Sequence, residues 1–179
     1  MKGGRGVISR QDRSTEIETL IDEYGDDILR LCYIYTKDYS QAEDLFQEVF
    51  IKIYKSLDNF RQDSDIYTWI TRIAINTCKD YLKSAWIKRN ILFWDVKTEE
   101  KGTVETDVIK GIDRDYILNA VLNLPEKYRV VIYLYYYKGF TTADISQILN
   151  TKESTIRSRL MRAREILKSN LKEGLAYEE

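Results

Sequence analysis

The stretch over residues 141–168, TTADISQILNTKESTIRSRLMRAREILK, decides the fold because it predicts two short helices joined by a tight turn. Thr141 stands where a hydroxyl accepts a first-turn amide, and Asp144, three residues later, completes a capping box. Asn150 is one of the few residue types besides glycine that tolerate a left-handed backbone, so the first helix is expected to end there. The pattern is typical of a helix-turn-helix.

One face of each of these two helices is apolar. In the first helix, Ile145, Ile148 and Leu149 mark the inward side. In the second helix, four residues recur at i, i+4, i+7 and i+11, which places them in a narrow stripe. They are Ile156, Leu160, Ala163 and Leu167. We expect both faces to line the core of one domain.

The outer face of the second helix is polar and basic. The residues expected on it are Ser154, Thr155, Ser158, Met161, Arg162 and Glu165, flanked by Arg157, Arg159 and Arg164. Residues 153–168 contain five basic and two acidic side chains, a local net charge of +3. Arginine has the bidentate geometry that reads guanine edges, so this face suits the major groove of DNA. The alternative is an amphipathic surface helix whose charges are only solvated.

The composition restricts the possible functions. The chain has 179 residues and a formal net charge of −1, so any contact with nucleic acid has to be a local patch. It has no histidine, the commonest metal ligand and general base near neutral pH. Its first glycines lie in a short leader and form no phosphate-binding loop. We expect no intrinsic enzyme activity, and no metal, cofactor or small-molecule substrate.

The sequence also predicts a cytoplasmic protein without membrane insertion. The leader lacks the apolar run of a signal peptide. The longest apolar run, residues 130–137, is far shorter than the ~20 residues that span a bilayer. Cys32 and Cys78 lie far apart in the sequence and inside apolar helical patterns, as expected of buried thiols in a reducing compartment.

The whole chain has helical periodicity and no convincing strand. We expect an all-α fold with two small helical domains joined by a flexible linker. The expected limits are a disordered leader over 1–13, a first domain over 14–83, a linker over 84–112 and a second domain over 113–175. Within the second domain, Pro125 is expected to begin a helix that ends at Gly139.

Two segments of the first domain carry polar groups at informative positions. In AEDLFQEVFIKIYKSL, residues 42–57, the side chains of Asp44, Gln47 and Glu48 share one exposed side. By periodicity alone, a solvated acidic face is the simpler interpretation. FRQDSD, residues 60–65, has loop composition and precedes a helix expected over 66–83.

That helix distributes several aromatic, amide and basic residues between the edge of the core and the surface. They include Tyr67, Trp69, Arg72, Asn76, Lys79 and Lys83. Such side chains beside an adaptable loop are what a single-stranded nucleic-acid site uses, because every base offers a face for stacking. A tryptophan at helical spacing is nevertheless more often a core residue.

The expected linker begins with an apolar part. Its residues are Trp86, Ile87, Ile91, Leu92, Phe93 and Trp94. They are too apolar for free solution, so we expect them to pack on the first domain or on a partner.

Four blocks, in this order, resemble the bacterial extracytoplasmic-function (ECF) sigma factors of the sigma-70 family. They are AEDLFQEVFIKIY, FRQDSDIYTWITRIAINTCKDYLK, LPEKYRVVIYLYYYKGF and the helix-turn-helix. The resemblance covers about residues 14–172. It implies a sigma domain 2 over 14–83 and a sigma domain 4 over 113–175, in a dissociable subunit of RNA polymerase.

The resemblance also implies three sites. The acidic face would dock on the β′ clamp helices of the polymerase, which replaces the solvated-face interpretation; it comprises Asp44, Gln47 and Glu48. The −10 element of the promoter would contact the loop that captures a flipped base, with the adjoining helix: Phe60, Arg61, Asp63, Ser64, Tyr67, Trp69, Arg72 and Asn76. The −35 element would contact Ser154, Thr155, Arg157, Ser158, Arg159 and Arg162.

The function so implied is to bind core polymerase, recognise both promoter elements and help melt the promoter of a stress or envelope regulon. The implied partners are core polymerase, through its β′ clamp helices and β flap, promoter DNA, and an anti-sigma factor, which in this family is often membrane-anchored. The chain departs from the family at Asn150, where glycine is usual, and at Lys152, where proline or serine is common.

Two other classes of protein remain open. A stand-alone helix-turn-helix repressor or activator would usually dimerise on a palindrome, whereas a sigma factor uses one copy on an asymmetric site. A protein-binding scaffold would leave the arginine-rich outer face without a purpose.

Overall fold

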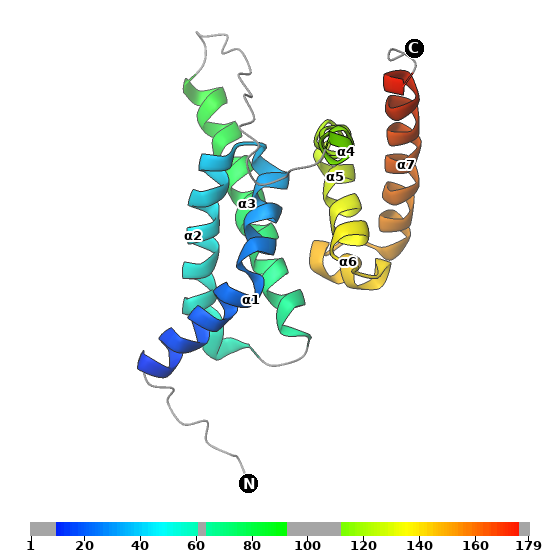
Figure 1. Ribbon diagram of the computed structural model, residues 1–179. Coiled ribbons are helices and arrows are strands. Elements are labelled where there is room, and N and C mark those ends of the chain that lie inside the picture. The colour runs from blue at the N-terminus through cyan, green and yellow to red at the C-terminus, as the bar shows by residue number, and fades with distance from the viewer. Residues whose placement is uncertain (1–9, 61–63, 93–111, 176–179) are drawn as a thin grey trace.

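The computed structural model describes residues 10–60, 64–92 and 112–175 (Figure 1). Every regular element in these ranges is helical, which confirms the all-α prediction. The long helices of the first half are α1 (Arg10–Thr36), α2 (Tyr39–Ser56) and α3 (Ile66–Leu92), with a 3₁₀ turn at Leu57–Asn59. The second half has α4 (Ile112–Leu122), α5 (Glu126–Ile132), a π-helical turn at Tyr133–Tyr137, α6 (Thr142–Leu149) and α7 (Glu153–Leu175).

The first three helices pack on one another through their apolar stripes. Helix α1 contacts both α2 and α3. The fully buried residues from the three helices include Leu31, Leu45, Val49, Ile70 and Ala74. Helix α1 begins at Arg10, inside the leader that was expected to be disordered.

A tight turn separates α1 from α2. Lys37 has a φ of 57°, in the left-handed region, and Asp38 is the N-cap of α2. The Asp38 Oδ1 atom accepts a hydrogen bond of 2.9 Å from the Gln41 amide. A capping carboxylate therefore fixes the start of α2.

Helix α3 is longer than the sequence predicted. It continues past Lys83 to Leu92, into the segment expected to be a linker. No glycine or proline lies between residues 84 and 92 to end it. The side chains of the apolar part of that segment lie outside the described residues, so its expected packing stays a prediction.

The helix-turn-helix forms as predicted. The Asp144 amide donates to Thr141 Oγ1 at 3.2 Å, and the Thr141 amide donates to Asp144 Oδ2 at 2.9 Å, which completes the capping box. Asn150 ends α6 with a φ of 48°. In α7, Ile156 and Ala163 are fully buried.

The segment before the helix-turn-helix differs from the prediction in detail. Pro125 is the N-cap of α5, so Glu126 is the first helical residue. The helix passes into a π-helical turn and ends before Gly139, whose φ of 70° favours glycine.

The two halves pack against each other. Figure 1 shows α1, α2 and α3 side by side, with α4 to α7 along one side of them. Helix α3 contacts α6, and α1 contacts α5. The sequence predicted two domains and a linker but gave no indication of this interface.

Candidate nucleic-acid and polymerase interfaces

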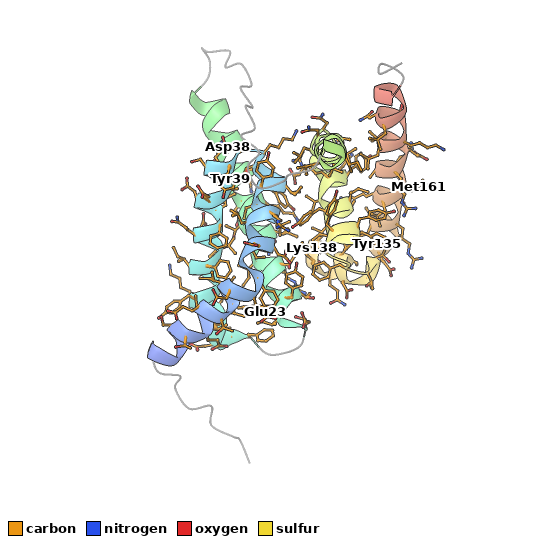
Figure 2. All side chains as sticks on the ribbon, in the orientation of Figure 1. Glu23, Asp38, Tyr39, Tyr135, Lys138 and Met161 are labelled. Atoms are coloured by element: carbon orange, nitrogen blue, oxygen red, sulfur yellow. The ribbon has the colours of Figure 1, made fainter. Side chains whose placement is uncertain are left out.

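The outer face of α7 is open to solvent. Ser154, Arg157, Ser158 and Arg162 are exposed, whereas Thr155 and Arg159 are partly buried. Met161 is 53% exposed and points away from the first three helices (Figure 2). The exposed side chains among them need no rearrangement of the fold to reach a ligand.

Two ion pairs lie on this face. Arg157 pairs with Glu153 at 2.7 Å, and Arg162 lies 3.6 Å from Glu165. Exposed pairs of this kind stabilise a protein by at most about 1 kcal/mol, so a phosphate or a base edge can replace the carboxylate at little cost.

Glu153 also joins the two helices of the motif. Its Oε1 atom accepts a 2.6 Å hydrogen bond from the Thr142 hydroxyl of α6. This bond, with the contact from Arg157, holds the pKa of Glu153 below its usual range. The sequence analysis missed this link, because Thr142 and Glu153 lie on different helices.

Phe60 and Trp69, which precede and follow residues 61–65 in the sequence, form an aromatic pair. The rings of Phe60 and Trp69 have centroids 5.1 Å apart and planes tilted by 43°. Asp65 Oδ1 accepts a 2.9 Å hydrogen bond from the Tyr67 amide and so caps the start of α3. The rings of Phe60 and Trp69 together form one aromatic wall. Arg61 and Asp63, which were predicted here, lie outside the described residues.

The structure also describes three polar residues of the predicted −10 set, on α3 or just before it. Ser64 and Arg72 are partly buried and Asn76 is exposed. Among the described residues, the buried Nε of Arg72 has no hydrogen-bond partner.

Tyr67 makes contacts of a different kind. Its hydroxyl donates to Asp27 Oδ2 of α1 at 2.9 Å. Its ring stacks on Tyr24, with centroids 5.1 Å apart, and on Phe140 of the second half, 5.2 Å away. Burial, followed by the hydrogen bond to Asp27, raises the pKa of Tyr67 well above its ordinary value. The structure thus places Tyr67 in the interface between the halves.

The acidic face of α2 is exposed as predicted. Asp44, Gln47 and Glu48 all lie at the surface, and Glu48 pairs with Lys52 at 2.8 Å. The sequence analysis missed Ile51, which is 53% exposed. Ile51 follows Gln47 by four residues and Glu48 by three, so it shares their face. That spacing could have identified it.

A groove opens between α4, the end of α5 and α7. Its volume is about 550 Å³. Its lining is mainly apolar and comprises Ile117, Val121, Ile132, Tyr136, Tyr137, Arg164, Leu167, Lys168 and Leu171. Three of these apolar side chains are markedly exposed, with Ile117 at 46%, Tyr136 at 56% and Tyr137 at 53%. The sequence analysis did not identify this groove.

Both halves match known protein families. The models of sigma-70 region 2 and sigma-70 region 4 match residues 20–87 and 114–167. The chain is 35% identical over 172 residues to the RNA polymerase sigma-H factor of Pseudomonas aeruginosa, with 89% of this chain and 88% of that protein covered. This chain belongs to the ECF sigma factors of the sigma-70 family. The sigma factor is also 31% identical over 167 residues to the ECF sigma factor SigW of Bacillus subtilis, covering 86% of this chain and 88% of SigW.

Two solved structures share the fold of this sigma factor. One is the sigma factor RpoE of Bartonella quintana in complex with the anti-sigma factor NepR, at a TM-score of 0.74 and 23% identity. The match covers 88% of this chain and 97% of RpoE. The other is CnrH in complex with the cytosolic domain of CnrY, at a TM-score of 0.63 and 17% identity, covering 89% of each chain.

The described part of the chain lacks two kinds of feature. In this part, no helix is long and apolar enough to cross a membrane. The same residues contain no group of three or more side chains arranged to hold a metal ion.

Proposed function

We propose that this sigma factor binds core RNA polymerase in the cytoplasm, recognises the −35 and −10 elements of a promoter and helps to open the DNA between them. The observation that carries the proposal is the pairing, in one ECF sigma factor, of an exposed basic recognition helix with an aromatic wall beside a loop. The first suits duplex DNA and the second suits an unstacked base. The proposed domain limits are 14–83 and 113–175.

The −35 element is assigned to the outer face of α7. Arg157 and Arg162 are exposed, and each is paired only with a carboxylate on its own helix. The first turn of α7 is fixed to α6 by Glu153, so the helix is presented as a rigid unit. A rigid, basic helix with exposed arginine forks fits the major groove.

The −10 element is assigned to the wall of Phe60 and Trp69 with the polar groups of α3. Extruding a base costs a few kcal/mol of stacking and pairing. Stacking on an aromatic side chain returns roughly 1–3 kcal/mol per base, so a wall of two rings offsets much of the cost. Asn76, exposed on the same helix, supplies an amide for the base edge.

Core polymerase is assigned two contacts. The acidic face of α2 combines Asp44, Gln47 and Glu48 with the exposed Ile51, and such a mixed surface suits the β′ clamp helices. The apolar groove between α4 and α7 suits an apolar segment of the β flap. Both surfaces suit a protein partner, so we assign this chain a binding role.

An anti-sigma factor is a further proposed partner. RpoE and CnrH share the fold. RpoE was solved in complex with the anti-sigma factor NepR, and CnrH in complex with the cytosolic domain of CnrY. We propose that an anti-sigma protein, which a membrane anchor could hold at the inner surface, covers part of the polymerase- and DNA-binding surfaces described above.

In vitro transcription tests this function. Purified core polymerase is incubated with the sigma factor and a library of genomic fragments, and the transcript starts are mapped. Transcripts that require both components and share two upstream elements are expected. A chain that protects a palindrome without polymerase, and gives no core-dependent transcript, would instead be a stand-alone regulator.

A further inference from the structure

An almost completely buried arginine joins the two domains. Arg129 of α5 is 5% exposed. Its Nε donates to the carbonyl of Ile34 at 2.6 Å, and its Nη2 makes a longer contact of 3.4 Å to the carbonyl of Tyr35. Its Nη1 donates to the carbonyls of Leu122 and Leu124, at 2.9 and 3.1 Å. One guanidinium therefore binds backbone atoms of both domains.

The two carbonyls on the first domain are the ones that a helix cannot satisfy itself. Ile34 and Tyr35 lie in the last turn of α1, which ends at Thr36, and carbonyls there lack a partner within the helix. A cation at this end of a helix is also favoured by the helix dipole. Burial lowers the pKa of Arg129, but a guanidinium starts so far above neutral pH that it stays charged.

A second contact across the interface centres on Asp27 of α1. Its carboxylate pairs with Lys138, whose side chain is only 11% exposed. Its backbone carbonyl accepts a 3.2 Å hydrogen bond from the Tyr133 hydroxyl. Figure 2 shows Lys138 between the two sets of helices. Three polar side chains of the second domain, including Arg129, thus bind α1.

A residue assigned to the −10 element lies at this interface. Tyr67, from the −10 set, is stacked between Tyr24 and Phe140. The contact of α3 with α6 also fixes the separation of the two DNA-binding surfaces.

We propose that the free sigma factor is held closed by an interdomain latch, Arg129 on the end of α1 and Lys138 on Asp27, and that core polymerase binds the open form. The proposal rests on the proposed function, because it makes opening a step between the free chain and a promoter-competent one. The latch is reversible, since the polar groups it joins can be hydrated when the domains separate. Opening separates Tyr67 from Phe140, and it lets the two surfaces reach separate DNA elements.

Distance measurements on spin-labelled protein test the latch. Labels are placed by Lys55→Cys on α2 and Ser169→Cys on α7, both exposed positions. The native Cys32 and Cys78 are fully buried, which favours labelling at the introduced sites. Double electron–electron resonance on the free, full-length protein is expected to give one short, narrow distance distribution. Arg129→Ala should shift it to longer, broader distances.

Two further variants keep the test decisive. Arg129 also binds Leu122 and Leu124 in its own domain, so its loss could disturb that domain. The double variant Asp27→Asn with Tyr133→Phe leaves the Arg129 contacts inside the second domain in place. It weakens the contacts that Asp27 makes to Lys138, to Tyr133 and to Tyr67 of its own domain, and it should also broaden the distances. Arg13→Ala removes an ion pair with Asp58 inside the first domain and should leave them unchanged. Unchanged distances in both latch variants, or broad distances in the wild type, would overturn the latch.

Titration with core polymerase separates the latch from the proposed function. Core should move the wild-type labels to long distances. If about one free wild-type molecule in ten is open, its apparent Kd for core is about tenfold weaker than that of the open form. Arg129→Ala, which is open already, should therefore bind core about tenfold more tightly. Holoenzyme that keeps the short distance would overturn the coupling to core. A wild-type chain that does not bind core at all would refute the proposed function, while the distances in the free chain would still decide whether the latch exists.

Discussion

Tyr67 of α3 stacks on Phe140, the residue two positions before α6, with ring centroids 5.2 Å apart and planes 17° apart. The contact joins the helix assigned to the −10 element with the motif assigned to the −35 element. Tyr67 is held in place on the other side by Tyr24 and by its hydrogen bond to Asp27. A residue that the sequence placed beside the DNA is therefore also part of the interdomain contact.

The Tyr67 hydroxyl should contribute to stability. Tyr67→Phe keeps the stacked ring but removes the hydrogen bond to the Asp27 carboxylate, which should lower the free energy of unfolding by about 1–2 kcal/mol. Urea denaturation followed by circular dichroism measures the loss. Tyr39→Phe is the matched control, because Tyr39 is 50% exposed and should change stability by less than about 0.5 kcal/mol. Equal midpoints for both variants would show that the bond to Asp27 adds nothing.

Charge reversal on α2 should weaken binding to core polymerase without affecting the fold. Asp44→Arg or Glu48→Arg places a cation on the proposed docking face, whereas Asp22→Arg makes the same charge change on an exposed position of α1. Pull-down against core polymerase, beside a thermal melt of each variant, measures both effects. If Asp44→Arg and Asp22→Arg reduce binding to core polymerase equally, the assignment of the docking site to the acidic face of α2 is wrong.

Arg162 should discriminate between DNA sequences. If Arg162 makes a bidentate contact to a base, Arg162→Ala should cost about 1–3 kcal/mol on the −35 element and little on a scrambled site. Arg164→Ala, if that arginine contacts only phosphate, should weaken both sites alike and flatten the salt dependence. Titrations of matched and scrambled duplexes at several salt concentrations separate the two cases. An Arg162 variant that loses equal affinity on both duplexes would identify a phosphate contact.

The aromatic wall should act in promoter opening. Holoenzymes carrying Phe60→Ala or Asn76→Ala should still form closed complexes, because the −35 contacts remain, but they should yield permanganate-reactive open complexes slowly. The expected reason is the loss of stacking worth roughly 1–3 kcal/mol for a captured base.

A template already melted across the −10 element is the control for that experiment. It should restore much of the activity of both variants, since opening is the step they lack. Opening of duplex promoter at the wild-type rate by both variants would show that this loop does not capture a base.

Glu153 should make the helix-turn-helix sensitive to acid. Its pKa is depressed by the Thr142 hydroxyl and then by Arg157, so its contribution to stability is present above about pH 4.5 and is lost as the pH falls through the lowered value. Glu153→Gln should therefore be less stable than the wild type at pH 7, and the difference should shrink below about pH 4.5. Thermal melts across this range measure it. A difference that stays constant with pH would exclude a role for the carboxylate charge.

Local interactions made much of the fold predictable. The capping box of Thr141 and Asp144, the left-handed Asn150 and the buried stripe of α7 all depend on residues within a few positions of one another. Helix ends were less predictable where the sequence has no glycine or proline. Helix α3 continues to Leu92 because residues 84–92 contain no glycine or proline to end it. The exposed face of Asp44, Gln47 and Glu48 also followed from spacing alone.

The sequence by itself determined an all-α chain, a helix-turn-helix with a basic outer face, and an acidic face on α2, because each of these is set by contacts along one helix or one turn. Only the tertiary structure decided where Tyr67 lies, that Arg129 is buried, and that a groove opens between α4 and α7. Arg129 and Ile34 are 95 positions apart, and Tyr133 and Asp27 are 106 apart. Periodicity places an arginine on a helix surface. Only the packing of another domain determines whether its guanidinium is hydrated or binds the carbonyls at the end of another helix.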